Sequence, residues 1–177
     1  MGILTETPKK TLDLDRLALT PGGGTRLDLA VDPGSVELGR EVYSAAEGPQ
    51  IARLDVSRTA AGHACRLRFG IDLAGPCVSC LDPAKQRIEV DAREVHQPSS
   101  GDEELVSPYV DGAELRLAAW ARDALVLAMP ARFLCRPDCA GLCPVCGESL
   151  NDADPEDHRH ETGPDPRWAK LRELELE

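Results

Sequence analysis

Hydrophobic and polar residues alternate through the first half of the chain, from residue 25 to residue 96. Segments 27–31, 65–71 and 88–92 each carry a hydrophobic residue at every second position. Successive side chains of a β-strand point to opposite faces, so this alternation predicts one apolar and one charged sheet face. Gly and Pro residues interrupt the pattern at intervals typical of hairpins. We therefore predict an antiparallel β-sheet of about five or six strands over residues 25–96.

A different spacing appears in residues 113–130, where hydrophobic residues recur with the period of an α-helix. The residues with this spacing are Leu117, Trp120, Ala121, Ala124, Leu125 and Ala128. The pattern predicts one central amphipathic helix. Asp111 and Glu114 have the spacing of a capping box at its start, and Pro130 favours its end. A second, short helix is predicted at residues 164–177, because an Asp-Pro pair there suits a helix N-terminus.

The remaining segments complete the expected organisation. Residues 1–24 form an N-terminal arm that ends in a Gly-rich break, and residues 97–112 predict an acidic, exposed loop. Residues 131–163 contain most of the cysteines and predict a zinc-binding segment. The expected fold class is α+β, with an antiparallel β-sheet in the N-terminal half, a central helix, a Cys-rich zinc-knuckle segment and a short C-terminal helix.

The chain is acidic, and its charge is unevenly distributed. Its formal net charge is -11 over 177 residues. Residues 1–100 hold 12 basic and 14 acidic residues, whereas residues 101–177 hold 8 and 17. Such an acidic second half repels a phosphate backbone, so direct contact with RNA is expected only through a local basic face. The chain shows neither a long apolar stretch nor a signal-peptide pattern, which predicts a cytoplasmic protein without membrane contact.

The chain has seven cysteines, a high number for a protein expected in the reducing cytosol, where cysteines favour metal ligation over disulfides. Six of them and two histidines have spacings typical of zinc ligands: Cys77, Cys80, Cys135, Cys139, Cys143, Cys146, His158 and His160. Zinc takes four such ligands in a tetrahedron, so these residues are enough for two structural ions. Cys65 is left over on the hydrophobic side of a strand, where a buried free thiol is expected.

Two groupings of these ligands are compatible with the spacing. The preferred grouping makes two sites, one of Cys77, Cys80, Cys135 and Cys139, and one of Cys143, Cys146, His158 and His160. The alternative makes a single all-cysteine site of Cys135, Cys139, Cys143 and Cys146. The sequence therefore predicts one or two structural Zn²⁺ ions.

No catalytic motif accompanies these ligands. The chain lacks the G-x-S-x-G, P-loop and G-x-G-x-x-G patterns. Hydrolytic zinc sites mix histidines with carboxylates and keep one position open, whereas thiolates dominate here. We predict a protein that is not an enzyme and has no small-molecule substrate.

Several strings of residues resemble the YceD family, the large ribosomal RNA subunit accumulation proteins. They are LCRPDCAGLCPVCG at residues 134–147, CVSCL at 77–81, LAMP at 127–130 and DPRW at 165–168. The resemblance implies a cytoplasmic, non-enzymatic factor that supports 23S rRNA accumulation and large ribosomal subunit biogenesis. Many relatives carry C-x-C where this chain has His158 and His160, which favours the grouping with two sites.

Two surfaces are candidates for contact with a ribosomal precursor particle. We hypothesise that RNA binds to Arg66 and Arg68, which lie on the charged face of the predicted sheet. The acidic residues 102–104 and 152–161 suit a basic ribosomal protein. Two alternative functions stay open, namely a zinc-stabilised adaptor for protein interactions unrelated to ribosomes and a redox switch at one C-x2-C pair.

Overall fold

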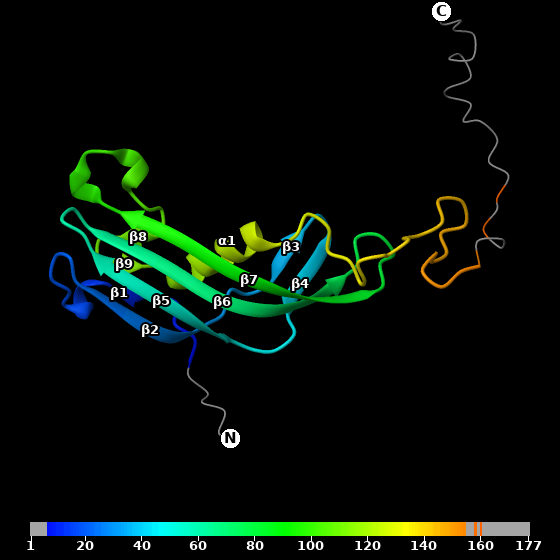
Figure 1. Ribbon diagram of the computed structural model, residues 1–177, viewed down its shortest axis with the longest axis horizontal. Helices are drawn as coiled ribbons and strands as arrows, with labels where there is room; N and C mark the ends of the chain where they lie inside the picture. Colours follow the sequence, from blue (N-terminus) through cyan, green and yellow to red (C-terminus); the bar gives the residue numbers. More distant parts are fainter. Residues whose placement is uncertain (1–6, 155–157, 159, 161–177) are drawn as a thin grey trace, which may run out of the picture.

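A six-stranded antiparallel sheet is the main element of the computed structural model, which describes residues 7–154, 158 and 160. Its strands are β2 (Gly24–Val31), β3 (Val36–Leu38), β4 (Glu41–Ala45), β5 (Gln50–Arg58), β6 (His63–Pro76) and β7 (Pro83–His96). The strand order is β2-β5-β6-β4-β3, and β7 pairs with the other edge of β6 (Figure 1). The antiparallel sheet predicted over residues 25–96 is therefore confirmed.

One face of this sheet is buried and the other is exposed, as the alternation predicts. The buried residues of β6 occupy every second position: His63, Cys65, Leu67, Phe69, Ile71 and Leu73. Leu67 lies opposite Leu54 of β5 and Ala92 of β7, so neighbouring strands bury the same face. Cys65 is 7% exposed, which confirms the buried free thiol. Burial raises the pKa of this thiol to about 11, so it stays protonated at neutral pH.

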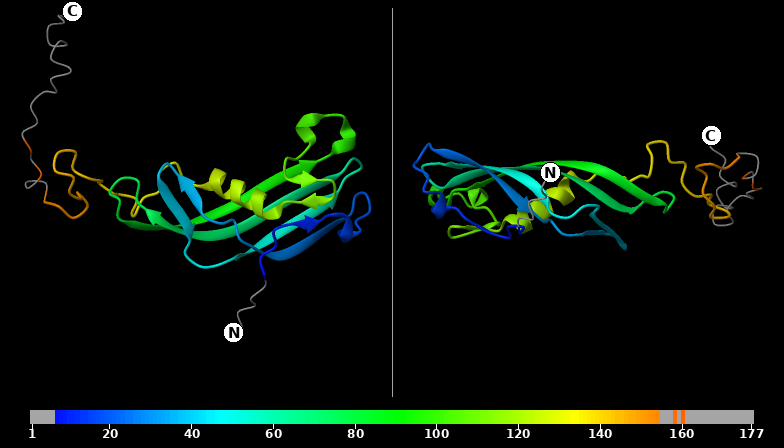
Figure 2. Two further views of the ribbon diagram at one scale, coloured as in Figure 1. Left: turned by 180° about the vertical axis from the view of Figure 1, so that it is seen from behind. Right: turned by 90° about the horizontal axis from the view of Figure 1, so that it is seen from below.

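Helix α1 (Leu117–Ala128) covers the buried face of the sheet (Figures 1 and 2). Its buried side chains are Leu117, Trp120, Ala121, Ala124 and Leu125. The helix ends where Met129 becomes extended before Pro130, as expected for the residue that precedes a proline. The predicted amphipathic helix is therefore confirmed. No helix among the described residues covers the opposite face of the sheet (Figure 2).

The predicted start of this helix is wrong. Asp111 and Glu114 lie in strands β8 (Val110–Asp111) and β9 (Glu114–Leu115) instead of a capping box. Gly112 between them has a φ of 59°, the left-handed conformation that a two-residue hairpin turn requires. Gly112, the first of the two loop residues, therefore directs this segment into a hairpin, and the helix begins only after it.

A small second sheet and three turns of 3-10 helix complete the described chain. Strand β1 (Leu12–Asp13) pairs with β9, so part of the predicted N-terminal arm belongs to a three-stranded sheet. The 3-10 helices are η1 (Asp15–Leu17), η2 (Pro98–Ser100) and η3 (Glu103–Leu105). The helix predicted at residues 164–177 lies outside the described residues. No helix of the described part is long and apolar enough to cross a membrane.

Two buried histidines face each other where β6 begins and β7 ends, far from the turn that connects these strands. His63 and His96 are cross-strand neighbours and are 6% and 8% exposed. Burial lowers the pKa of His63, the charge of Arg58 lowers it further, and Asp15 acts in the opposite direction. The unfolded chain therefore binds a proton at a higher pH than the folded chain does. His63 stabilises the fold above about pH 6.5, and this contribution is lost as the pH falls.

We expect the thermal unfolding temperature to fall between about pH 7 and about pH 5, and to fall less in the His63→Gln variant. The Gln amide does not titrate, and its oxygen can still accept a hydrogen bond from Arg58, whose Nη1 lies 3.0 Å from His63 Nε2. Calorimetry of both proteins over this pH range measures the difference. Equal slopes for the two proteins would mean that His63 does not cause the acid sensitivity.

Candidate metal centre

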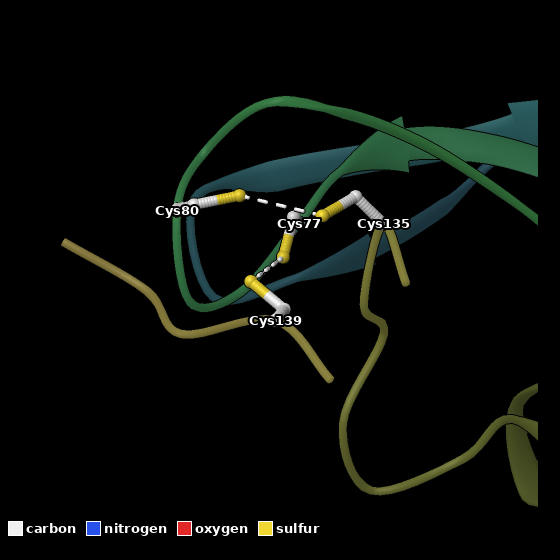
Figure 3. Close-up of side chains that lie close together, drawn as sticks. All are labelled: Cys77, Cys80, Cys135 and Cys139. Atoms are coloured by element: carbon white, nitrogen blue, oxygen red, sulfur yellow. Dashed lines mark hydrogen bonds between the residues drawn. The ribbon is translucent and has the colours of Figure 1, made fainter. Parts of the chain in front are cut away.

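Two segments that are distant in the chain bring four cysteines together at one end of the sheet (Figure 3). Cys77 and Cys80 lie in the turn between β6 and β7, and Cys135 and Cys139 lie in the segment after α1. The N–H of Cys77 donates to the C=O of Asp82 at 2.8 Å, which closes the turn. All four side chains point toward one another (Figure 3).

The four sulfur atoms are spaced as the ligands of one ion would be. The Sγ atoms of Cys77 and Cys139 are 3.7 Å apart, and those of Cys80 and Cys135 are 3.6 Å apart. All four lie within 4.8 Å of one another. Zinc–sulfur bonds of about 2.3 Å in a tetrahedron separate the sulfurs by about 3.8 Å, whereas a disulfide bond measures about 2.05 Å. The group therefore has the dimensions of a tetrahedral metal site.

Burial and backbone N–H groups give the two thiols of the turn different acidities. Cys77 is 0% exposed and Cys80 is 4% exposed. Burial acts to raise the pKa of Cys77, but N–H groups of Cys80, Ser79 and Cys135 outweigh it and lower the pKa to about 6. Burial raises the pKa of Cys80 to about 12. The lowered pKa of Cys77 favours its thiolate, which is the form of cysteine that binds a metal.

An aromatic contact fixes the position of the segment after α1. Phe133 is 2% exposed and packs edge-on against Tyr43 of β4, with ring centroids 4.8 Å apart. Its C=O accepts a hydrogen bond from the N–H of Val78 at 2.9 Å, which joins the segment to the turn. Sequence reasoning missed both aromatic residues, because only the packing of distant segments relates them to the cysteines.

A second group of ligand atoms lies in the loop that follows, which extends beyond the sheet (Figure 1). The ligand atoms of Cys143, Cys146, His158 and His160 lie within 4.8 Å of one another. The Sγ of Cys146 is 3.6 Å from Nδ1 of His158. The Nε2 of His160 is buried and has no hydrogen-bond partner among the described residues. A metal ion would satisfy this nitrogen, which is otherwise an unfavourable buried polar atom.

The backbone around Cys143 has the geometry of a knuckle. The N–H of Cys143 donates to the C=O of Glu148 at 2.8 Å, and the N–H of Gly147 donates to the C=O of Cys143 at 2.8 Å. Gly147 has a φ of 77°, a conformation that glycine adopts without strain. The N–H groups of Cys146 and Val145 lower the pKa of Cys143 to about 6. These N–H groups therefore favour the thiolate in this group as well.

The eight candidate ligands thus form two groups, each of which could hold a metal ion. Their composition matches the preferred grouping, and no group within the described residues combines the last four cysteines. Sequence reasoning assigned no role to Asn151, although it lies just after the Cys-rich string. Its Oδ1 accepts a hydrogen bond from the N–H of Ala140 at 2.9 Å, and its Nδ2 lies 3.9 Å from the Sγ of Cys135. Asn151 therefore ties the loop of the second group to the first.

The exposed face of the main sheet is a second candidate surface. Its charged residues are Arg26, Arg53, Arg66, Arg68, Lys85, Arg87 and Arg93, with Asp28, Glu37, Asp55, Asp72, Glu89 and Asp91. Cations therefore outnumber carboxylates on this face by one, although the whole chain has 20 basic and 31 acidic residues. Arg66 pairs with Asp91 at 2.5 Å, and Arg68 pairs with Asp55. The Nε of Arg68 is buried and has no partner in the described part of the chain.

The fold and the two groups define an α+β protein with two clusters of Cys and His side chains that could hold metal ions. The family model of the large ribosomal RNA subunit accumulation protein YceD matches residues 66–175. The chain belongs to this family. The matched region contains most of β6, all of β7 and α1, and all eight candidate ligands.

Proteins of several mycobacteria are similar to the chain. An uncharacterized protein of Mycobacterium tuberculosis is 34% identical over 171 residues, which cover 93% of this chain and 80% of the relative. An uncharacterized protein of Mycobacterium bovis has the same identity and coverage. An uncharacterized protein of Mycobacterium leprae is 35% identical over 104 residues, or 55% of this chain and 46% of the relative. No solved structure matches the chain significantly.

Proposed function

We propose that this chain is a non-enzymatic cytoplasmic factor that supports 23S rRNA accumulation and biogenesis of the large ribosomal subunit. The family match over residues 66–175 carries this proposal. The composition of the two clusters supports a structural role for their metal, because thiolates dominate and catalytic zinc sites keep one position free of protein ligands.

We further propose that each cluster holds one structural Zn²⁺. The residues that would hold the ions are Cys77, Cys80, Cys135 and Cys139 in the first cluster, and Cys143, Cys146, His158 and His160 in the second. The sulfur spacing of the first cluster and the unpaired Nε2 of His160 support this assignment. Bound zinc supplies a cross-link between segments that are too poor in hydrophobic residues to order themselves.

The exposed face of the sheet is the surface that we propose for contact with the ribosomal precursor particle. Its excess of cations suits the phosphates of RNA, whereas the rest of the acidic chain repels them. A basic ribosomal protein is the other partner to consider, because the acidic residues Asp102, Glu103 and Glu104 are exposed in and before η3. The dependence of binding on salt and on the arginines distinguishes these two contacts.

Replacing both Arg66 and Arg68 with Gln is expected to release the protein from large-subunit precursors and to lower the ratio of 23S to 16S rRNA. Gln is a polar side chain without the charge that attracts phosphates. The measurement uses a strain that lacks the chain and carries plasmid copies of each variant. Gradient sedimentation of the lysate reports association, and electrophoresis of total RNA reports the rRNA ratio.

The matched control replaces Arg16 and Arg122 with Gln, since both are exposed and lie away from this face. This control is expected to behave like the wild-type chain. The Arg66/Arg68 variant could instead associate normally with the particle, even at raised salt concentration. This result would reject contact through the arginines and favour contact through the acidic residues. If the strain that lacks the chain has the same rRNA ratio with and without the wild-type copy, the proposed function itself is rejected.

A further inference from the structure

The outer edge of β7 has no partner strand among the described residues. β7 pairs with β6 in an unbroken register from His63–His96 to Pro76–Pro83. No backbone hydrogen bond described outside the sheet ladders reaches residues 83–96. The edge therefore presents a row of unpaired N–H and C=O groups over 14 residues, and such a row readily pairs with another strand.

A hollow of about 320 Å³ lies between this edge and α1. Val90 and Ala92 of β7 line one side of it, and Trp120 and Leu127 of α1 line the other. Leu127 is 87% exposed, so its side chain is free to contact an added strand. A strand added to β7 would extend the sheet above this hollow and cover it with every second side chain.

The charges of β7 indicate which strand fits. On the exposed face of the sheet, Lys85 and Arg87 are followed at alternate positions by Glu89 and Asp91. All four side chains are exposed to solvent. An antiparallel copy of the same strand presents these charges in the reverse order, so its carboxylates meet the cations of the first copy. The strand is therefore complementary to itself.

We propose that two copies of this chain pair through β7 to form an antiparallel dimer with Ile88 on the two-fold axis. In this register Lys85 lies opposite the partner's Asp91, and Arg87 lies opposite the partner's Glu89. The symmetry repeats both pairs, so four opposite-charge pairs cross the junction. On the buried side, Ile88 meets the partner's Ile88. One continuous sheet then runs through both copies.

The same charges exclude a neighbouring register. Moving the axis by two residues, to Val90, keeps the faces of the strands aligned. It places Arg87 opposite the partner's Arg93, and Glu89 opposite the partner's Asp91. Like charges directly opposite each other destabilise a strand pair. Charges on an edge strand normally prevent association. In β7 their order instead gives opposite-charge pairs with a second copy of the strand, and like-charge repulsion in the shifted register.

Charge exchange across the junction tests the dimer. The acidic variant carries Lys85→Glu and Arg87→Glu, and the basic variant carries Glu89→Lys and Asp91→Lys. We expect sedimentation equilibrium to give the wild-type chain twice its monomer mass and each variant alone its monomer mass. An equimolar mixture of the two variants is expected to recover the doubled mass, because each like-charge pair becomes an opposite-charge pair. A control with Arg16→Glu and Arg122→Glu is expected to stay dimeric.

Three results would each overturn the proposal: a monomeric wild-type chain, variants that remain dimeric, or a mixture that stays monomeric. Circular dichroism verifies that the variants keep their sheet. If a variant unfolds, Arg87→Gln combined with Glu89→Gln replaces it, since this variant removes two of the four opposite-charge pairs without reversing a charge. That variant must then shift the equilibrium toward monomer, and an unchanged dimer rejects the register.

Discussion

Replacing Cys77 and Cys80 with serine is expected to remove one of two metal ions from each chain and to lower the unfolding temperature strongly. Serine hydroxyls do not replace thiolates as zinc ligands, and these two residues supply half of the first cluster. A structural zinc site contributes an apparent binding free energy of about 10–16 kcal/mol in zinc-finger peptides. We expect only part of this in the whole chain, because the sheet and α1 have a hydrophobic core of their own. Elemental analysis and thermal unfolding of the purified variant measure both effects.

Two further variants make this prediction specific. Cys65→Ala removes a buried thiol outside both clusters and is expected to leave the metal content unchanged. Replacing Cys143 and Cys146 with serine is expected to remove the other ion with a smaller loss of stability, because that loop extends beyond the sheet (Figure 1). Two ions in the Cys77/Cys80 variant, or none in the wild-type chain, would refute the proposed sites.

Local patterns in the sequence predict the sheet and the helix because both depend on periodicity. Alternation along β6 and β7 marks the face that is buried, and the helical spacing from Leu117 onward marks the side of α1 that contacts the sheet. The sequence misplaces the start of the helix because Asp111 and Glu114 suit both a capping box and a hairpin. Gly112 decides in favour of the hairpin, since it provides the positive φ of the turn.

Spacing also identifies the eight candidate ligands but leaves their grouping open. Cys139 is as close in the chain to Cys143 as it is to Cys135, so spacing alone permits an all-cysteine group. The contact between Phe133 and Tyr43 carries the segment after α1 to the turn of β6 and β7. This contact joins residues 90 positions apart, and no local pattern predicts it. The free edge of β7 depends on the order of the strands in the sheet, which local patterns likewise do not predict.

Replacing Phe133 with alanine is expected to loosen the first cluster as well as to destabilise the chain. Its ring fills the space against Tyr43, and truncation of a buried Phe typically costs about 3–5 kcal/mol. Without this anchor, the segment that carries Cys135 and Cys139 separates more often from the turn. We therefore expect a chelator to remove one of the two ions several-fold faster, under conditions in which the sheet remains folded. Urea titration measures the stability, and a colorimetric chelator measures the release.

Phe69 provides the matched control, because it is the other phenylalanine of the chain and is buried in the sheet at 5% exposure. Phe69→Ala is expected to reduce stability by a similar amount, yet to leave metal release unchanged while the chain is folded. Faster release in both variants would mean that the ions escape through global unfolding. Faster release in the Phe133 variant alone would mean that the aromatic contact holds the cysteine segments together. The side chain of Phe133 would then link the hydrophobic core to the geometry of the first cluster.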